Sequence, residues 1–317
     1  MGAGDEFELI EAMRRTYEAA GGPPPGEVWI GDDAAVVTGS AGPLLLATDL
    51  VVAGVHADPA VSTAADLGYK ALAVTVSDLA AMGARPRWAL VSLAGPPGSD
   101  VLAVAAGVAE AAAEVGCAVV GGDLSAAPVV TVSVAVVGSL VPPGEPGPLR
   151  RSGARPGDSL WLTGPLGASA AGLRLARSGA TSGAAAPLVA AHRRPRARLA
   201  EGEAARLAGA SAAVDISDGL VADARHLAEA SGVGLALVGI PVADGATPAE
   251  ALAGGEDYEL LLATPDGSRL VAAFAAAGLR PPLPVGTCTP SPGHHRLDDG
   301  PLPAGGWRHR FGAPEGG

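Results

Sequence analysis

The chain has 317 residues, 48% of them hydrophobic, which is enough apolar material for two domains of ordinary size. Its formal net charge of −12 argues against a nucleic-acid partner, because the phosphate backbone would be repelled. Its two cysteines, Cys117 and Cys288, are far apart and indicate neither a disulfide framework nor a zinc site.

No stretch of the sequence is typical of a membrane span or a signal peptide. The N-terminal residues 5–20 predict an amphipathic helix that begins with acidic residues. The most apolar run, 128–141, is shorter than the ~20 residues that cross a bilayer, and its Val and Thr content favours a strand. We therefore expect a cytoplasmic protein without a membrane partner.

The first half of the chain alternates predicted helices with predicted strands. Helices are expected at 5–20, 64–82 and 100–114, and strands at 44–49, 88–93, 118–120 and 129–140. Acidic residues stand at the ends of several of these elements. This order predicts an α+β domain with one active edge.

A Pro- and Gly-rich linker at 142–148 divides the chain, so we expect domains at 1–144 and 145–317. The second half is expected to contain a long Ala-rich helix at 187–208 and a Pro-, Gly- and His-rich tail that reaches Trp307. Its other expected elements are strands at 160–162, 212–214 and 234–239 and helices at 168–177, after Gly219 and at 267–278.

The predicted helix 64–82 carries an acidic residue on an apolar face. Asp78 shares this face with Leu67, Ala71 and Val74, whereas the polar sector expected to be solvated is Asp66, Lys70 and Ser77. A carboxylate in apolar company needs a partner. A buried salt bridge or a helix cap would satisfy Asp78, but a metal ion is favoured. Lys70 is the single lysine of the chain, and no phosphate-binding GxxxxGK[ST] loop contains it.

The segment Asp215-Ile216-Ser217-Asp218-Gly219-Leu220 lies at a predicted strand-to-helix junction. Ser217 or Asp218 can be a simple helix cap there. Alternatively, Asp215 and Asp218 can share a divalent cation, since Mg²⁺ prefers oxygen ligands. Similar carboxylates recur at the ends of other apolar elements, namely at Asp32, Asp33, Asp49, Asp78 and Asp123. Their recurrence favours the metal hypothesis.

Seven motifs, in order along nearly the whole chain, resemble those of thiamine-monophosphate kinases. They are Gly31-Asp32-Asp33-Ala34-Ala35, Thr48-Asp49, Tyr69-Lys70-Ala71-Leu72-Ala73-Val74 with Ser77-Asp78-Leu79-Ala80-Ala81-Met82-Gly83, Gly121-Gly122-Asp123, Arg151-Ser152-Gly153-Ala154, the Asp215–Leu220 segment and Gly254-Gly255-Glu256-Asp257-Tyr258-Glu259-Leu260. The resemblance implies ATP-dependent phosphorylation of thiamine phosphate to thiamine diphosphate. It also implies a homodimer in which the sheets of the N-terminal α+β domains pair into a barrel. The C-terminal α/β domain would complete an ATP cleft.

The resemblance further implies three groups of site residues. Several Mg²⁺ ions would be held by Asp33, Asp49, Asp78, Asp123, Asp215 and Asp218, with Asp32 and Thr48 assisting. ATP would contact Arg151, Ser217, Gly122 and Asp123, and the thiamine end would contact His56, Glu256 and Trp307. No general base is implied, because the acceptor phosphate is already an anion.

Plain alternatives exist for several single residues. His56 can be an ordinary loop histidine, Arg151 a surface charge in a linker, and Trp307 a packing residue. Two positions depart from the family pattern, because Ala47 and Leu124 stand where an oxygen-bearing side chain is common. The alternative functions are another ATP-using enzyme, similar to aminoimidazole ribonucleotide synthetase, and a non-catalytic, metal- or nucleotide-binding regulatory dimer.

Overall fold

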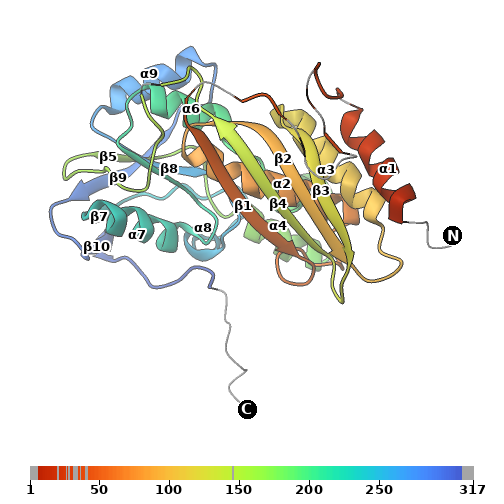
Figure 1. The fold of residues 1–317 in the computed structure, drawn as a ribbon. Coiled ribbons are helices and arrows are strands. Elements are labelled where there is room, and N and C mark those ends of the chain that lie inside the picture. Colours follow the sequence, from red (N-terminus) through yellow and green to blue (C-terminus); the bar gives the residue numbers. More distant parts are fainter. Residues whose placement is uncertain are drawn as a thin grey trace.

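The structure is a computed structural model that describes residues 6–19, 21–25, 27, 29–30, 35, 37–39, 42–144 and 146–308. It contains two mixed β-sheets, each with its own hydrophobic core, in a two-domain α+β arrangement (Figure 1). The cores consist mainly of Ala, Val and Leu. In the described part of the chain, no helix is long and apolar enough to cross a membrane.

The first sheet has four strands in the order β1-β4-β2-β3, and helices α2 and α3 lie behind it in Figure 1. Strands β1 and β2 are antiparallel to β4, whereas β3 is parallel to β2. The elements of this half are α1 (Glu6–Glu18), β1 (Leu44–Val52), α2 (Ala64–Ala81), β2 (Arg85–Gly95), α3 (Val101–Val115), β3 (Ala118–Ala126) and β4 (Thr131–Ser139).

The second sheet has seven strands in the order β11-β10-β7-β9-β5-β8-β6, so Asp215 ends an edge strand. Its elements are β5 (Ser159–Leu162), α4 (Ala168–Arg177), η1 (Gly183–Ala185), α5 (Ala186–Arg193), α6 (Leu199–Leu207), β6 (Ala212–Asp215), α7 (Leu220–Ser231), β7 (Gly234–Leu237), α8 (Pro248–Ala253), β8 (Leu260–Thr264), α9 (Gly267–Ala276), β9 (Leu283–Thr289), β10 (His295–Leu297) and β11 (Gly300–Pro301).

Three sequence-based expectations about elements are wrong. The expected helix 187–208 is two helices, α5 and α6, because Pro195 cannot donate a helical hydrogen bond. The expected tail contains β9, β10 and β11. The Gly121-Gly122-Asp123 motif lies inside β3 rather than after a strand, because Gly122 allows β2 to approach closely. A Cβ at Gly122 would lie 1.8 Å from the Val91 carbonyl oxygen.

Helix α2 lies between the two halves of the molecule, and its polar sector is buried rather than solvated. Asp66, Lys70 and Ser77 are only 7%, 1% and 0% exposed. Each of them bonds a residue of the C-terminal half, at distances of 2.6–2.7 Å: the pairs are Asp66–Arg194, Lys70–Glu256 and Ser77–Asp215. The helix therefore connects the N-terminal half to the end of β6 and to the segments that follow α5 and α8.

Candidate functional site

Asp215 marks the point where the two halves of the molecule meet around acidic side chains. Strand β6 is buried along its whole length and ends at Asp215, which is 4% exposed. The hydroxyl of Ser77, on α2, donates a hydrogen bond of 2.7 Å to the Asp215 carboxylate. The carboxylate is thus fixed in direction, and its buried oxygen has a hydrogen-bond partner.

Three carboxylates from different elements lie close enough to influence one another. Burial raises the pKa of Asp49, on β1, and the charge of Asp215 raises it further. Burial likewise raises the pKa of Asp78, on α2, to about 7, and Asp215 and Asp49 add to the shift. Burial also raises the pKa of Asp215, against the hydrogen bond from Ser77 and the charge of Arg151. These carboxylates repel one another, so a cation between them would be stabilising.

Arg151 lies near this acidic cluster, because its positive charge opposes the upward pKa shifts of both Asp78 and Asp215. Its backbone is held against the C-terminal half: the Arg151 carbonyl accepts a hydrogen bond from the Ser231 hydroxyl, and the Arg150 carbonyl accepts one from the Ala213 N–H. Its side chain is exposed. Arg151 is therefore a cation beside the site, and the structure leaves it available to an anionic ligand.

The loop after Asp215 is shaped by an acidic residue that sequence reasoning missed. Asp223 lies in the first turn of α7 and accepts hydrogen bonds from the N–H groups of Asp218 and Gly219, at 3.0 and 3.1 Å. Burial, with the charges of Asp215 and Asp218, raises the pKa of Asp223 to about 8. The sequence did not indicate this role, because Asp223 lies within a predicted helix and accepts hydrogen bonds from backbone N–H groups that precede that helix.

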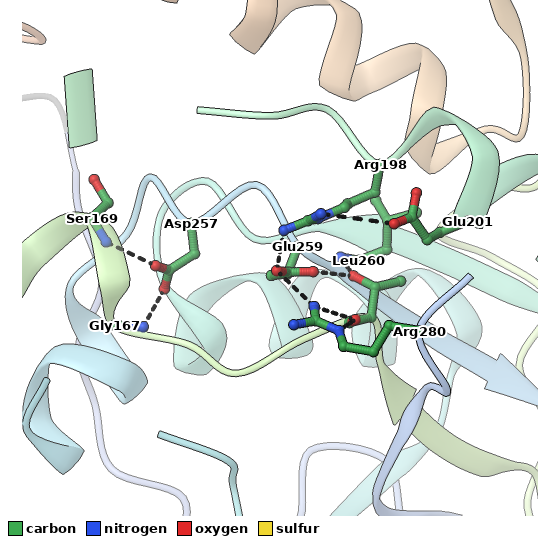
Figure 2. Close-up of polar contacts among 9 residues, drawn as sticks. Gly167, Ser169, Arg198, Glu201, Asp257, Glu259, Leu260 and Arg280 are labelled. Atoms are coloured by element: carbon green, nitrogen blue, oxygen red, sulfur yellow. Dashed lines mark hydrogen bonds and ion pairs between the residues drawn. The ribbon is translucent and has the colours of Figure 1, made fainter. Parts of the chain in front are cut away.

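The Gly254–Leu260 segment contains three carboxylates, and two of them serve the fold. Asp257 accepts hydrogen bonds from the N–H groups of Gly167 and Ser169, at 2.7 and 3.2 Å, where α4 begins (Figure 2). Glu259 is paired with Arg198 at 2.6 Å and with Arg280 at 3.4 Å, as Figure 2 shows. It also accepts a hydrogen bond from the Thr163 hydroxyl.

Glu256 is the remaining carboxylate of this segment. Its side chain is 27% exposed and borders a pocket of about 260 Å³. Its Oε1 atom lies 2.6 Å from the Lys70 ammonium, and its Oε2 atom lies 3.4 Å from Nδ1 of His192. Burial favours a higher pKa, but His192 and Lys70 outweigh it and lower the pKa of Glu256. The site therefore holds Glu256 as a carboxylate.

The backbone around Glu256 is strained. Glu256 and Tyr258 have φ angles of 58° and 50°, in the left-handed region that non-glycine residues rarely occupy. Two hydrogen bonds hold the segment to the 216–217 loop: Glu256 N–H to the Ser217 carbonyl at 2.7 Å, and Tyr258 N–H to the Ile216 carbonyl at 2.9 Å. Such strain often accompanies a functional site. Only the structure reveals it, because a sequence carries no φ angles.

His56 and Trp307 lie on segments that are anchored to the site. Nδ1 of His56 accepts a hydrogen bond of 3.0 Å from the Val52 N–H, so the proton of a neutral His56 ring is on Nε2. The His56 carbonyl accepts a hydrogen bond from Lys70 at 2.8 Å. The backbone N–H of Trp307 donates a hydrogen bond of 2.9 Å to the backbone carbonyl of Asp218. Trp307 is 51% exposed.

The other predicted site residues are less closely grouped. Gly122 and Asp123 are exposed on β3, and Ser217 is half-buried beside Asp218. Thr48 is exposed on the face of β1 opposite Asp49, where its hydroxyl donates to the Val134 carbonyl. Asp32 and Asp33 lie outside the described residues. Within the described ranges, no group of three or more His, Cys, Asp or Glu side chains is arranged to hold one ion.

The two halves of the chain match a known domain pair. Residues 31–140 match the family model of the AIR synthase related protein, N-terminal domain, and residues 155–298 match that of the C-terminal domain. The fold and the acidic site between the halves therefore define a protein of the AIR synthase related class.

Comparison with individual relatives identifies the family within this class. The thiamine-monophosphate kinase of Mycobacterium tuberculosis (strain H37Rv) is 36% identical over 304 residues, which cover 93% of this chain and 86% of that protein. The structure of thiamine-monophosphate kinase from Stenotrophomonas maltophilia K279a aligns with a TM-score of 0.80 and 33% identity, covering 94% of this chain and 98% of that one. AaThiL complexed with AMPPCP and TMP aligns with a TM-score of 0.76 and 34% identity, covering 96% and 97%. The chain belongs to the thiamine-monophosphate kinase family.

Proposed function

We propose that the protein transfers the γ-phosphoryl group of ATP to thiamine phosphate and forms thiamine diphosphate. The observation that carries this proposal is that Asp49 and Asp78 of the N-terminal half lie near Asp215 of the C-terminal half. The chain also belongs to the family of thiamine-monophosphate kinases. A phosphate oxygen of thiamine phosphate forms the new bond to the γ-phosphorus, the bond between that phosphorus and the β–γ bridging oxygen breaks, and ADP leaves. The attacking oxygen is already an anion, so no side chain needs to remove a proton.

Carboxylate oxygens are the donors that Mg²⁺ prefers, and the mutual repulsion of Asp49, Asp78 and Asp215 fits a bound cation. The residues proposed to hold Mg²⁺ are these three with Asp33, Asp123 and Asp218, assisted by Asp32 and Thr48. Thr48 can assist only through its backbone, because its hydroxyl lies on the face of β1 opposite Asp49. When bound, the metal would neutralise charge on the phosphate oxygens.

We propose that the nucleotide lies against Arg151, Ser217, Gly122 and Asp123. The exposed Arg151 beside the carboxylates supports this assignment, because a guanidinium suits phosphate oxygens. We assign the thiamine end to His56, Glu256 and Trp307. A carboxylate and an aromatic face suit the cationic thiazolium ring, and Glu256 is held ionised by Lys70.

An assay of the purified protein with ATP, Mg²⁺ and thiamine phosphate tests the proposed function directly. We expect thiamine diphosphate from thiamine phosphate and none from free thiamine, which serves as the control acceptor. Release of ADP without thiamine diphosphate would assign the chain to a sister enzyme with another acceptor. A protein that binds ATP and Mg²⁺ without turnover would instead be a regulatory dimer.

We also propose that the protein is a cytoplasmic homodimer whose four-stranded sheets pair into a barrel, with the domain boundary at 144/145. Leu44, Leu46 and Leu50 of β1 and Leu90 of β2 are 46–75% exposed on the same face of the sheet, and a contiguous apolar patch of this kind marks an interaction surface. The boundary is supported by the two family matches, because the first ends at residue 140 and the second begins at residue 155.

Replacing Leu46, which is 75% exposed, with Asp should convert the dimer to a monomer, because a charge would be buried between the two sheets. Light scattering after size-exclusion chromatography measures the molar mass. The matched control is Leu207→Asp, since Leu207 is 38% exposed at the end of α6, away from this sheet. A wild-type protein that is monomeric at micromolar concentration would contradict the proposed dimer.

A further inference from the structure

Lys70 differs from every other basic residue of the chain. It is the single lysine among 21 lysine and arginine residues, and it is also 1% exposed, in the middle of α2. All the others of these 21 residues have the planar guanidinium of Arg, whereas Lys70 has a compact ammonium that acts as a point charge. A lysine retained at one buried position of an arginine-rich chain therefore points to a need for the ammonium itself.

The Lys70 ammonium contacts two segments that are distant in sequence. It donates a hydrogen bond of 2.8 Å to the carbonyl of His56, in the loop after β1, and it lies 2.6 Å from Oε1 of Glu256. These two segments contain two of the residues assigned above to the thiamine end. One cation thus joins the His56 loop of the N-terminal half to the strained Glu256 segment of the C-terminal half.

A second contact orients the same carboxylate from its other side. Nδ1 of His192 lies 3.4 Å from Oε2 of Glu256 and 3.1 Å from the hydroxyl of Ser169. Both His192 and Lys70 are buried, with 3% and 1% exposure, whereas Glu256 keeps 27% of its side chain exposed. The buried partners are therefore arranged to hold a carboxylate that a ligand can reach.

We propose that Lys70 is a positioning residue for the acceptor substrate: it fixes Glu256 and the His56 loop in the geometry that binds the thiamine end. This inference rests on the proposed function, and specifically on the assignment of Glu256 and His56 to thiamine phosphate. Lys70 itself does not touch the reacting atoms. Its loss should weaken binding of thiamine phosphate and leave ATP binding almost unchanged, because the ATP site is assigned to other residues.

The test compares Michaelis constants in Lys70→Met, which removes the ammonium at similar volume. We expect the KM for thiamine phosphate to rise about tenfold, the usual scale for one misplaced charged contact, and the KM for ATP to change by less than about twofold. The matched control is Arg206→Met. Arg206 is also 1% exposed and donates to backbone carbonyls, but away from the site. It should lower the melting temperature without separating the two KM values.

A double-mutant cycle with Glu256→Gln distinguishes positioning from an independent contact. If Lys70 acts through Glu256, Lys70→Met should raise the KM for thiamine phosphate much less in the Glu256→Gln background than in the wild type. Additive effects would overturn the proposal, as would equal rises in both KM values or an unchanged KM for thiamine phosphate. A wild-type protein that makes no thiamine diphosphate would instead overturn the proposed function on which the inference rests.

Discussion

Replacing Asp78 with Asn should lower kcat by about 10²–10³-fold, the usual loss when one charged group is removed from a preorganised site. The same replacement should stabilise the metal-free protein at pH 8. Burial disfavours the charged form of Asp78, and the charges of Asp215 and Asp49 add to this effect, so an uncharged amide of the same shape removes both costs. Activity and stability should therefore change in opposite directions, which is typical of a group that serves a ligand rather than the fold.

The pKa of Asp78 determines how its contribution to stability changes with pH. Burial, with the charges of Asp215 and Asp49, raises the pKa of Asp78 to about 7 in the folded protein, from an ordinary value of 3.8. Its proton therefore favours the folded state between these values, and this contribution to stability is lost as the pH rises through 7. The melting temperature of wild type, measured with EDTA, should fall relative to that of Asp78→Asn between pH 4 and pH 8.

Asp66→Asn is the matched control, because Asp66 lies on the same helix but has the opposite electrostatic environment. Although burial opposes it, the hydrogen bonds from Arg194 and Thr63 lower the pKa of Asp66. This variant should lose stability at pH 8 and keep kcat within about twofold of wild type, since the carboxylate has no ligand role. Near-normal kcat in Asp78→Asn at saturating Mg²⁺ would exclude Asp78 from the proposed metal site.

The sequence predicted much of the fold because most elements follow local rules. Helix α2 and helix α3 begin and end within a residue or so of their predicted bounds, since apolar periodicity and capping residues are local signals. The break at Pro195 is also local, but the Ala-rich composition of 187–208 outweighed it. Strands β9 to β11 were missed because Pro and Gly interrupt their alternation.

The candidate site divides in a similar way. Motif order indicated Asp49, Asp78 and Asp215, and the structure places these three close enough for their charges to raise one another's pKa values. That they bind metal stays a prediction. The sequence did not predict which polar side chains are buried against a distant part of the chain. Lys70 was expected in a solvated sector, yet it is buried against Glu256, because α2 is covered on a second side by the C-terminal half. Long-range pairs of this kind leave no periodic signal.

The position of α2 itself depends on two glycines at its crossing with α3. A Cβ at Gly107 would lie 1.8 Å from the Ala65 carbonyl oxygen, and one at Gly68 would lie 2.0 Å from the Val104 carbonyl oxygen. Neither glycine is needed for an unusual φ angle, because both lie in regular helix. Their role is to let the two helix backbones approach each other.

Gly107→Ala should therefore destabilise the protein by about 3 kcal/mol, the upper part of the usual cost of overpacking, although alanine favours a helix by about 1 kcal/mol over glycine. Unfolding in urea measures the change in free energy. The matched control is Ala106→Gly, one residue earlier on the exposed face of α3, which should cost only the ~1 kcal/mol of helix propensity.

The sign of the Gly107→Ala change distinguishes close helix packing from helix propensity, since propensity alone predicts that Gly107→Ala stabilises the protein. Ala106→Gly should destabilise the protein in either case. A stabilised Gly107→Ala protein would mean that α2 and α3 can separate without cost. If α2 is instead pushed away from α3, the side chains that it presents to the C-terminal half must move as well. Because Lys70, Ser77 and Asp78 all lie on α2, the kcat of folded Gly107→Ala should fall, whereas that of Ala106→Gly should not.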